Sequence, residues 1–231
     1  MATMKPLLRS TRRAVIDTAG KWRELAPPAR WGRGKALTEL ATRWTTTEVP
    51  EVDALLASHA KTAGFCAAEG EVGDRDVDLM LEGDAPGGRT LLVVVPLGDE
   101  PLGLDVEQAF IRSATNDRLR GGHPPITHMA RRVFNVDPAA LRTLRYRFLE
   151  QASLLLQRAE ARACKQAVLM FHELRSPLTP MQLMADQRAD LDAFMQKAVH
   201  RGAQAAPGKL IGPVHNGTAV ALFMGRVLVE K

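Results

Sequence analysis

The clearest pattern of apolar and polar positions lies in residues 74–100. Apolar and polar side chains alternate over residues 76–82, and this period of two predicts a strand with one buried face. Residues 84–88 include a proline and two glycines and predict a turn. The run Leu91–Val95 has no polar side chain, which predicts a strand covered on both faces. We therefore expect an acidic hairpin whose second strand is central in a sheet and ends or kinks at Pro96.

Other parts of the chain follow helical periodicity. A helix is expected to begin at Pro50, and apolar spacing predicts further helices over residues 35–44, 106–113, 138–163 and 188–201. A second apolar run, Gln166–His172, predicts a strand after the longest helix. Because strand, helix and strand follow in this order, we expect a crossover connection and a mixed or parallel sheet. The last residues, Thr218–Val229, predict a closing strand or a hairpin kinked at Gly225.

Three segments lack a clear period. Residues 1–20 are basic and weakly amphipathic and predict a short helix or a loose arm. Residues 21–31 contain two prolines and two tryptophans, so we expect a loop held in place by tryptophan packing. The alternative is that these tryptophans are exposed and stack on nucleobases. Residues 115–128 predict a loop, because glycines and prolines interrupt them.

The length and the element order predict an α/β protein. A chain of 231 residues is long enough for one domain, or one domain with an appendage, and can bury a sizeable core. We expect residues 1–60 to form a basic arm and a helical N-terminal extension. Residues 61–231 are expected to form an α/β core with a mixed central sheet flanked by helices, in one structural unit with the extension.

The charged residues are unevenly distributed along the chain, whose net charge is +5. Residues 1–43 carry ten basic and three acidic residues, and residues 51–109 carry thirteen acidic and three basic residues. Residues 110–165 are basic again, with eleven basic and four acidic residues. An acidic segment between basic flanks is typical of metal-assisted chemistry on a phosphate backbone, and equally of an ordinary solvated surface.

Cysteine content and hydropathy exclude several classes of protein. Cys66 and Cys164 are too few and too isolated for a disulfide framework or a zinc site. No segment reaches the ~18 consecutive apolar residues of a membrane span. The basic N-terminus is not followed by the apolar stretch of a signal peptide. We therefore expect a cytoplasmic protein that does not contact a membrane.

The order of helices, acidic hairpin, long helix and strand resembles the restriction-endonuclease-like fold of the PD-(D/E)xK superfamily. The chain is similar to a family of uncharacterised bacterial proteins assigned to that superfamily. The resembling segments are residues 22–28, 34–44, 76–79, 144–149 and 167–172. In the superfamily an acid begins one strand, and Glu/Asp-x-Lys lies on the next strand. The resemblance implies that two acids hold Mg²⁺ and that the lysine orients or deprotonates the attacking water.

The superfamily motif is only partly present in this chain. The resemblance assigns Asp78 as the first acid, and it assigns Glu69 or Glu71 as the acid that a preceding helix often supplies. The positions expected to carry the second acid and the lysine are occupied by Val95 and Leu97. A valine cannot bind a hard cation and a leucine cannot orient a water, so half of the motif is missing.

Two acids further along the chain are the candidate replacements. Asp99 and Glu100 stand four and five residues beyond the expected acid, which at ~3.3 Å per strand residue is a displacement of over ~10 Å. They can act only if the site has migrated. The candidate catalytic residues are therefore Asp78, Asp99, Glu100 and Glu69, and the candidate Mg²⁺ ligands are Asp78 and Asp99.

Three functions remain open. The first is a catalytically degenerate nuclease-fold protein that binds DNA, RNA or a protein partner, with Mg²⁺ or no cofactor. The second is an active Mg²⁺-dependent nuclease with a migrated site. The third is a structural or accessory protein, with a partner or as a homodimer, and with no role on nucleic acid. For the first function, the candidate nucleic-acid contacts are Arg9, Arg12, Arg13, Arg142 and Arg145.

Overall fold

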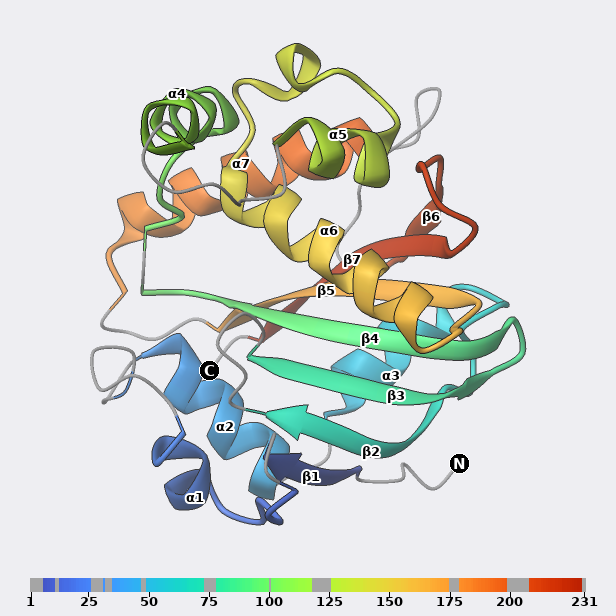
Figure 1. Ribbon diagram of the computed structural model, residues 1–231. Helices are drawn as coiled ribbons and strands as arrows, with labels where there is room; N and C mark the ends of the chain where they lie inside the picture. The colour runs from blue at the N-terminus through green and yellow to red at the C-terminus, as the bar shows by residue number, and fades with distance from the viewer. Residues whose placement is uncertain are drawn as a thin grey trace.

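A seven-stranded mixed sheet lies at the centre of the computed structural model, within its described residues (Figure 1). The strand order is β1-β2-β3-β4-β5-β7-β6. The strands are β1 Leu7–Ser10, β2 Cys66–Val72, β3 Leu79–Ala85, β4 Gly88–Leu97, β5 Gln166–Leu174, β6 Ile211–Val214 and β7 Ala221–Val229. The structure describes residues 6–10, 13–25, 31, 35–46, 49–72, 78–99, 101–117, 126–174, 179–198 and 208–229.

The predicted hairpin and its central strand are confirmed. β3 and β4 pair antiparallel from Ala85 and Gly88 at the turn to Leu79 and Val94 at the far end. On its other side β4 pairs in parallel with β5, so it is the fourth of the seven strands. The parallel pairing also confirms the predicted crossover, because parallel neighbours need a long connection between them.

Helices cover both faces of the sheet (Figure 1). The α2-side core contains Leu79, Leu81, Leu92 and Val94 and packs under α1, α2 and α3. The α6-side core contains Met80, Leu91, Val93 and Val95 and packs under α4, α5, α6 and α7. The helices are α1 Ala19–Arg23, α2 Ala36–Thr46, α3 Pro50–Ala57, α4 Val106–Asp117, α5 Ile126–Phe134, α6 Tyr146–Ala161 and α7 Met181–Ala198, with a 3₁₀ turn, η2, at Pro138–Leu141.

Two expectations for the hairpin strands are wrong. β3 does not have one buried face, because Met80 is 2% exposed on the side opposite Leu79 and Leu81. β4 does not end at Pro96, which pairs with His172 of β5 inside the parallel ladder. Because β3 stops pairing at Val94, the missing N–H of Pro96 costs no hydrogen bond on that side of β4.

The first half of the chain differs from the sequence expectation at three elements. Residues 7–10 form β1, a strand parallel to β2, rather than a helix or an arm. Residues 19–23 form the short helix α1, capped by the Thr18 hydroxyl, and residues 21–23 of it lie in the segment where a loop was expected. Trp22 in this helix is 1% exposed, so the expected packing of this tryptophan is confirmed. Glu69 and Glu71 lie on the strand β2 and not on a helix.

The helices of the second half differ from expectation mainly at their ends. The predicted helix 138–163 starts as η2, with the Asp137 carboxylate accepting from the Ala139 N–H at 2.9 Å. α6 begins only at Tyr146, because Arg145 is extended and forms a bridge with Asp105. α7 begins at Met181, seven residues before the predicted start. The predicted cap of α7, Gly202, lies outside the described residues.

Helix α5 is an element that the sequence expectation did not contain. It occupies the end of the predicted loop 115–128 and continues to Phe134. Ile126, Met129, Ala130 and Val133 are buried against the α6-side core. Their spacing of i, i+3, i+4 and i+7 is that of one helix face, so the period was present in the sequence.

Candidate functional site

An open groove of about 1060 Å³ lies over β1, β2 and β3, on the α6 side of the sheet. α6 packs on β4 and β5, and β1 and β2 extend away from it (Figure 1). We call this cavity the sheet groove. Its lining residues are Arg9, Ser10, Arg13, Glu69, Gly70, Glu71, Met80, Glu82, Gly83, Asp84, Arg89 and Arg162.

The floor of the sheet groove carries acids at positions that face one another. Glu69 of β2 is directly opposite Glu82 of β3 in the antiparallel register. Glu71 lies two residues further along β2, so its side chain points to the same face as that of Glu69. Like charges directly opposite one another destabilise a sheet, so this arrangement requires cationic partners.

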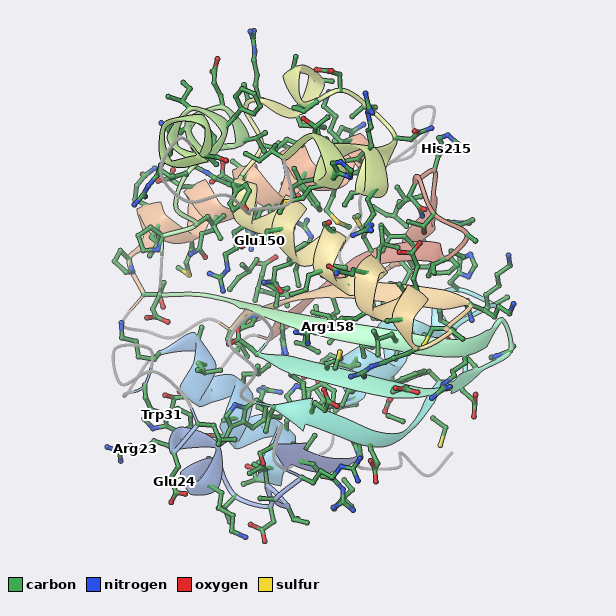
Figure 2. The ribbon with its side chains drawn as sticks, viewed as in Figure 1. Arg23, Glu24, Trp31, Glu150, Arg158 and His215 are labelled. Carbon is green, nitrogen blue, oxygen red and sulfur yellow. The ribbon has the colours of Figure 1, made fainter. Side chains whose placement is uncertain are left out.

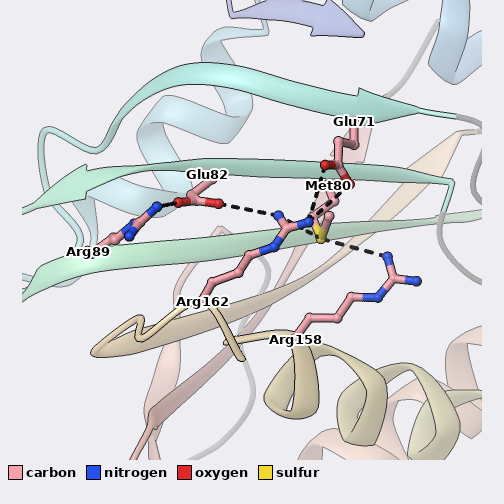
Figure 3. Close-up of polar contacts among 6 residues, drawn as sticks. All are labelled: Glu71, Met80, Glu82, Arg89, Arg158 and Arg162. Atoms are coloured by element: carbon pink, nitrogen blue, oxygen red, sulfur yellow. Dashed lines mark hydrogen bonds and ion pairs between the residues drawn. The ribbon is translucent and has the colours of Figure 1, made fainter. Parts of the chain in front are cut away.

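Arg162 supplies one such partner from the end of α6. Its Nη2 donates to both carboxylate oxygens of Glu71, at 3.2 and 3.1 Å, and its Nη1 donates to Glu82 at 3.3 Å. Arg89 donates to the other oxygen of Glu82. Figure 3 shows Arg162 between the two glutamates, with Arg158 and Arg162 both directed at the sulfur of Met80. Arg162 therefore links α6 to β2 and β3.

Arg9 is the cationic partner of Glu69, at the other side of the sheet groove. Its Nε lies 3.3 Å from Glu69 Oε1, and its Nη1 donates to the Arg13 carbonyl at 3.4 Å. Arg13 follows β1 in a turn in which its N–H donates to the Ser10 carbonyl. Its φ of +63° belongs to the left-handed region, and its side chain is exposed at the groove. The predicted contact Arg12 lies outside the described residues.

The arginines of the sheet groove differ in their surroundings: Arg162 lies between acids, and Arg9, Arg13 and Arg89 lie at the rim of the groove. The Arg162 side chain is 29% exposed, and both of its terminal nitrogens donate to acids. The Arg89 side chain is 54% exposed and contacts Glu82 through Nη2. Together with Arg9 and Arg13, Arg89 forms a rim of guanidinium groups. A planar guanidinium presents several N–H donors, so these side chains have the donors that a phosphate needs.

The two other predicted nucleic-acid contacts do not line the sheet groove. Arg142 is exposed between η2 and α6. Arg145 Nε donates to Asp190 of α7 at 2.7 Å, and its Nη1 donates to the Gly103 carbonyl at 3.0 Å. Arg145 therefore connects the start of α6 to α7 and to the loop before α4.

The candidate acids Asp78 and Asp99 each have a cationic neighbour. Asp78 lies 3.9 Å from the guanidinium of Arg147 on α6. Asp99 lies 2.8 Å from Lys35 Nζ and accepts a hydrogen bond from the Ala36 N–H at 2.5 Å. Asp99 thus caps the first turn of α2, where a negative charge also stabilises the helix dipole. Glu100 lies outside the described residues.

The described residues at this end of the hairpin do not fit Mg²⁺. Val95 and Leu97 are 2% and 3% exposed and belong to the α6-side core, so the positions of the missing acid and lysine are dry and apolar. Asp78 and Asp99 face cations that already neutralise them. No group of three His, Cys, Asp or Glu side chains within the described ranges is arranged to hold a metal ion.

Glu82, Arg89 and Arg162 are site residues that the sequence analysis did not identify. Glu82 and Arg89 occupy facing strands of the predicted hairpin, so their contact was available from the hairpin register. Arg162 is 80 residues from Glu82 and 91 from Glu71, and its contacts depend on how α6 packs on the sheet. Glu69 was assigned as a candidate catalytic residue, and Arg9 as a candidate nucleic-acid contact. The structure brings these two residues together.

Comparison of the chain with protein-family models, curated proteins and solved structures finds no match. None of the helices in the described ranges is long and apolar enough to cross a membrane. The assignment of a function therefore depends on the geometry and the chemistry of the sheet groove.

Proposed function

We propose that the protein binds nucleic acid in the sheet groove, through its phosphates, and does not cleave it. The observation that carries this proposal is the rim of Arg9, Arg13 and Arg89, which come from β1, the turn after it and the start of β4. Arginine forms bidentate, charge-assisted hydrogen bonds with phosphate, and side chains spread over three segments match a repeating phosphate backbone.

The chemistry of the sheet groove favours binding with little sequence preference. The lining residues that the structure describes include arginines, acids, glycines, a serine and a methionine, and none of these is aromatic. Stacking of bases on aromatic side chains is the usual basis of single-strand recognition. A site without such side chains reads the backbone alone, and backbone contacts carry no direct sequence information.

The absence of cleavage follows from the residues at the end of the hairpin. In-line attack on a phosphodiester needs a metal or another cation on the phosphate and an activated water. Val95 and Leu97 can supply neither, and Asp78 faces Arg147. We propose that the sheet is a restriction-endonuclease-like core that has lost this chemistry. Its antiparallel hairpin followed by a parallel crossover supports that proposal.

Replacing both rim residues, Arg9→Gln with Arg89→Gln, should weaken binding of a labelled 20-base-pair duplex about ten-fold at moderate salt. It should also reduce the salt slope of the logarithm of the affinity by about 2, since each lost phosphate contact removes roughly one unit. Fluorescence anisotropy at 50 and 150 mM salt measures both quantities.

The matched control for this experiment is Arg23→Gln with Arg142→Gln, which removes the same charge from exposed positions outside the sheet groove. Figure 2 shows Arg23 at the edge of the molecule, pointing outwards. Equal losses of affinity in the two double variants would show that the arginine rim is not the binding site. Undetectable binding by the unchanged protein would refute the proposed function.

The unchanged protein should leave plasmid and single-stranded DNA intact with Mg²⁺ or Mn²⁺, as followed by gel electrophoresis. Cleavage that disappears in Asp78→Ala would overturn this prediction and indicate a migrated active site. The double variant Val95→Glu with Leu97→Lys rebuilds the superfamily motif, but both side chains enter the α6-side core. It should therefore be strongly destabilised, and circular dichroism must show that it folds before its activity is interpreted.

A further inference from the structure

We infer that Glu69 acts as an internal competitor for the nucleic-acid phosphate on Arg9, and so limits the affinity of the sheet groove. This inference rests on the proposed function and concerns the same site. Its basis is the position of the Glu69 carboxylate, 3.3 Å from the guanidinium nitrogen Nε of Arg9. A carboxylate in this place resembles a bound phosphate oxygen in its negative charge.

Of the acids of the sheet groove that contact an arginine, Glu69 can be displaced most easily. Its side chain is 62% exposed, against 42% for Glu71 and 25% for Glu82. Glu71 accepts two hydrogen bonds from Arg162, and Glu82 lies between Arg162 and Arg89. Among the described residues, Glu69 has Arg9 as its cationic partner. An ion pair with a single contact and an exposed carboxylate is worth little, so a ligand can replace the carboxylate.

Displacement of Glu69 has a cost that reduces the affinity. When Arg9 turns to a phosphate, Glu69 loses its partner and remains directly opposite Glu82 in the sheet. The bound phosphate also adds a negative charge close to both carboxylates. A ligand with one phosphate gains little from this exchange. A polyanion that contacts Arg9, Arg13 and Arg89 together gains binding free energy at three sites, which exceeds the cost of displacing Glu69. The sheet groove therefore favours a nucleic-acid strand over a mononucleotide.

Glu69→Gln should therefore bind a labelled 20-base-pair duplex about five-fold more tightly than the unchanged protein, since a unit charge ~4 Å away is worth ~1 kcal/mol in water. Glu69→Asp keeps the charge and should show no such gain. Glu107→Gln is the matched control, because Glu107 is an exposed acid on α4, remote from the groove (Figure 1). At 150 mM salt the long-range effect of the Glu107 charge is screened, so Glu107→Gln should change the affinity for the duplex by less than about two-fold. Adenosine monophosphate serves as the competitor that carries a single phosphate.

The possible outcomes separate this inference from the proposed function. A gain confined to Glu69→Gln, with weak competition by the mononucleotide, supports both. If the unchanged protein binds the duplex and the Arg9 and Arg89 replacements weaken it, but Glu69→Gln binds no more tightly than Glu107→Gln, the inference is wrong and the proposed function stands. If no variant binds the duplex, both are wrong. Circular dichroism of each variant establishes that the comparison is between folded proteins.

Discussion

Replacement of Val94 by aspartate should leave most of the protein unfolded at neutral pH. Val94 is fully buried in β4, between Leu79 of β3 and Met170 of β5. The α2-side core around it consists of apolar side chains. A carboxylate there must either remain charged without a partner or bind a proton, and either state costs several kcal/mol. That cost is a large part of the ~5–15 kcal/mol by which domains are usually stable.

Urea denaturation followed by circular dichroism measures the effect of the Val94 replacement. Val94→Ala separates lost packing from the buried charge and should cost about 2 kcal/mol. Val15→Asp introduces the same carboxylate at a side chain that is 40% exposed and should change stability by less than ~1 kcal/mol. A Val94→Asp protein that unfolds cooperatively and is within ~1 kcal/mol of the unchanged protein would show that β4 is not buried on both faces.

Replacement of His172 by leucine should remove a large part of the loss of stability that the protein undergoes in acid. His172 is fully buried in β5, between Pro96 of β4 and Val227 of β7. Neither ring nitrogen has a hydrogen-bond partner among the described residues. Burial, together with the positive charge of Arg43, lowers the pKa of His172 from 6.5 to about 3.

The direction of the pH effect follows from these two pKa values. Above pH 6.5 the ring is neutral in both the folded and the unfolded chain, and burial of its charge costs nothing. As the pH falls from 6.5 to 3, the unfolded chain binds a proton that the folded chain excludes, so stability decreases. A shift of this size corresponds to about 5 kcal/mol at most, since one pKa unit is worth ~1.4 kcal/mol.

Urea denaturation at several values between pH 7 and pH 3 tests this prediction. Carboxylates also titrate in this range, so the informative quantity is the difference between the His172→Leu curve and that of the unchanged protein. That difference should be small at pH 7 and should increase towards pH 3. His128→Gln is the control, because His128 is exposed on α5 and should leave the curve unchanged. Parallel curves for His172→Leu and the unchanged protein would contradict the buried, neutral state of His172.

The central part of the fold could be predicted because its residues are apolar on both faces. Leu91–Val95 and Gln166–His172 lie between two layers of helices. A central strand is the position that covers both faces of such an apolar run. β1 and β2 could not be predicted in this way. They are short and carry charges towards the sheet groove, so their strand conformation depends on pairing between residues about 60 positions apart.

The candidate site was predictable in its residue types but not in its arrangement. Arg9 was identified from local charge and Glu69 from the resemblance, yet their contact requires the parallel pairing of β1 with β2. The resemblance to nucleases directed attention to Asp78 and Asp99, whose carboxylates contact Arg147 and Lys35. Arg162 was not identified from the sequence, because its partners Glu71 and Glu82 lie far away in the chain.

Strand β1 covers the edge of β2. Without β1, the seven residues of β2 would expose a row of unpaired backbone N–H and C=O groups, which is a template for pairing with another chain. The outer side of β1 is itself partly covered, because the Ser10 N–H donates to the Ala14 carbonyl and the Ile16 N–H donates to the Leu8 carbonyl. The N-terminal segment thus satisfies backbone groups of β2 and of β1 that could otherwise pair with another chain.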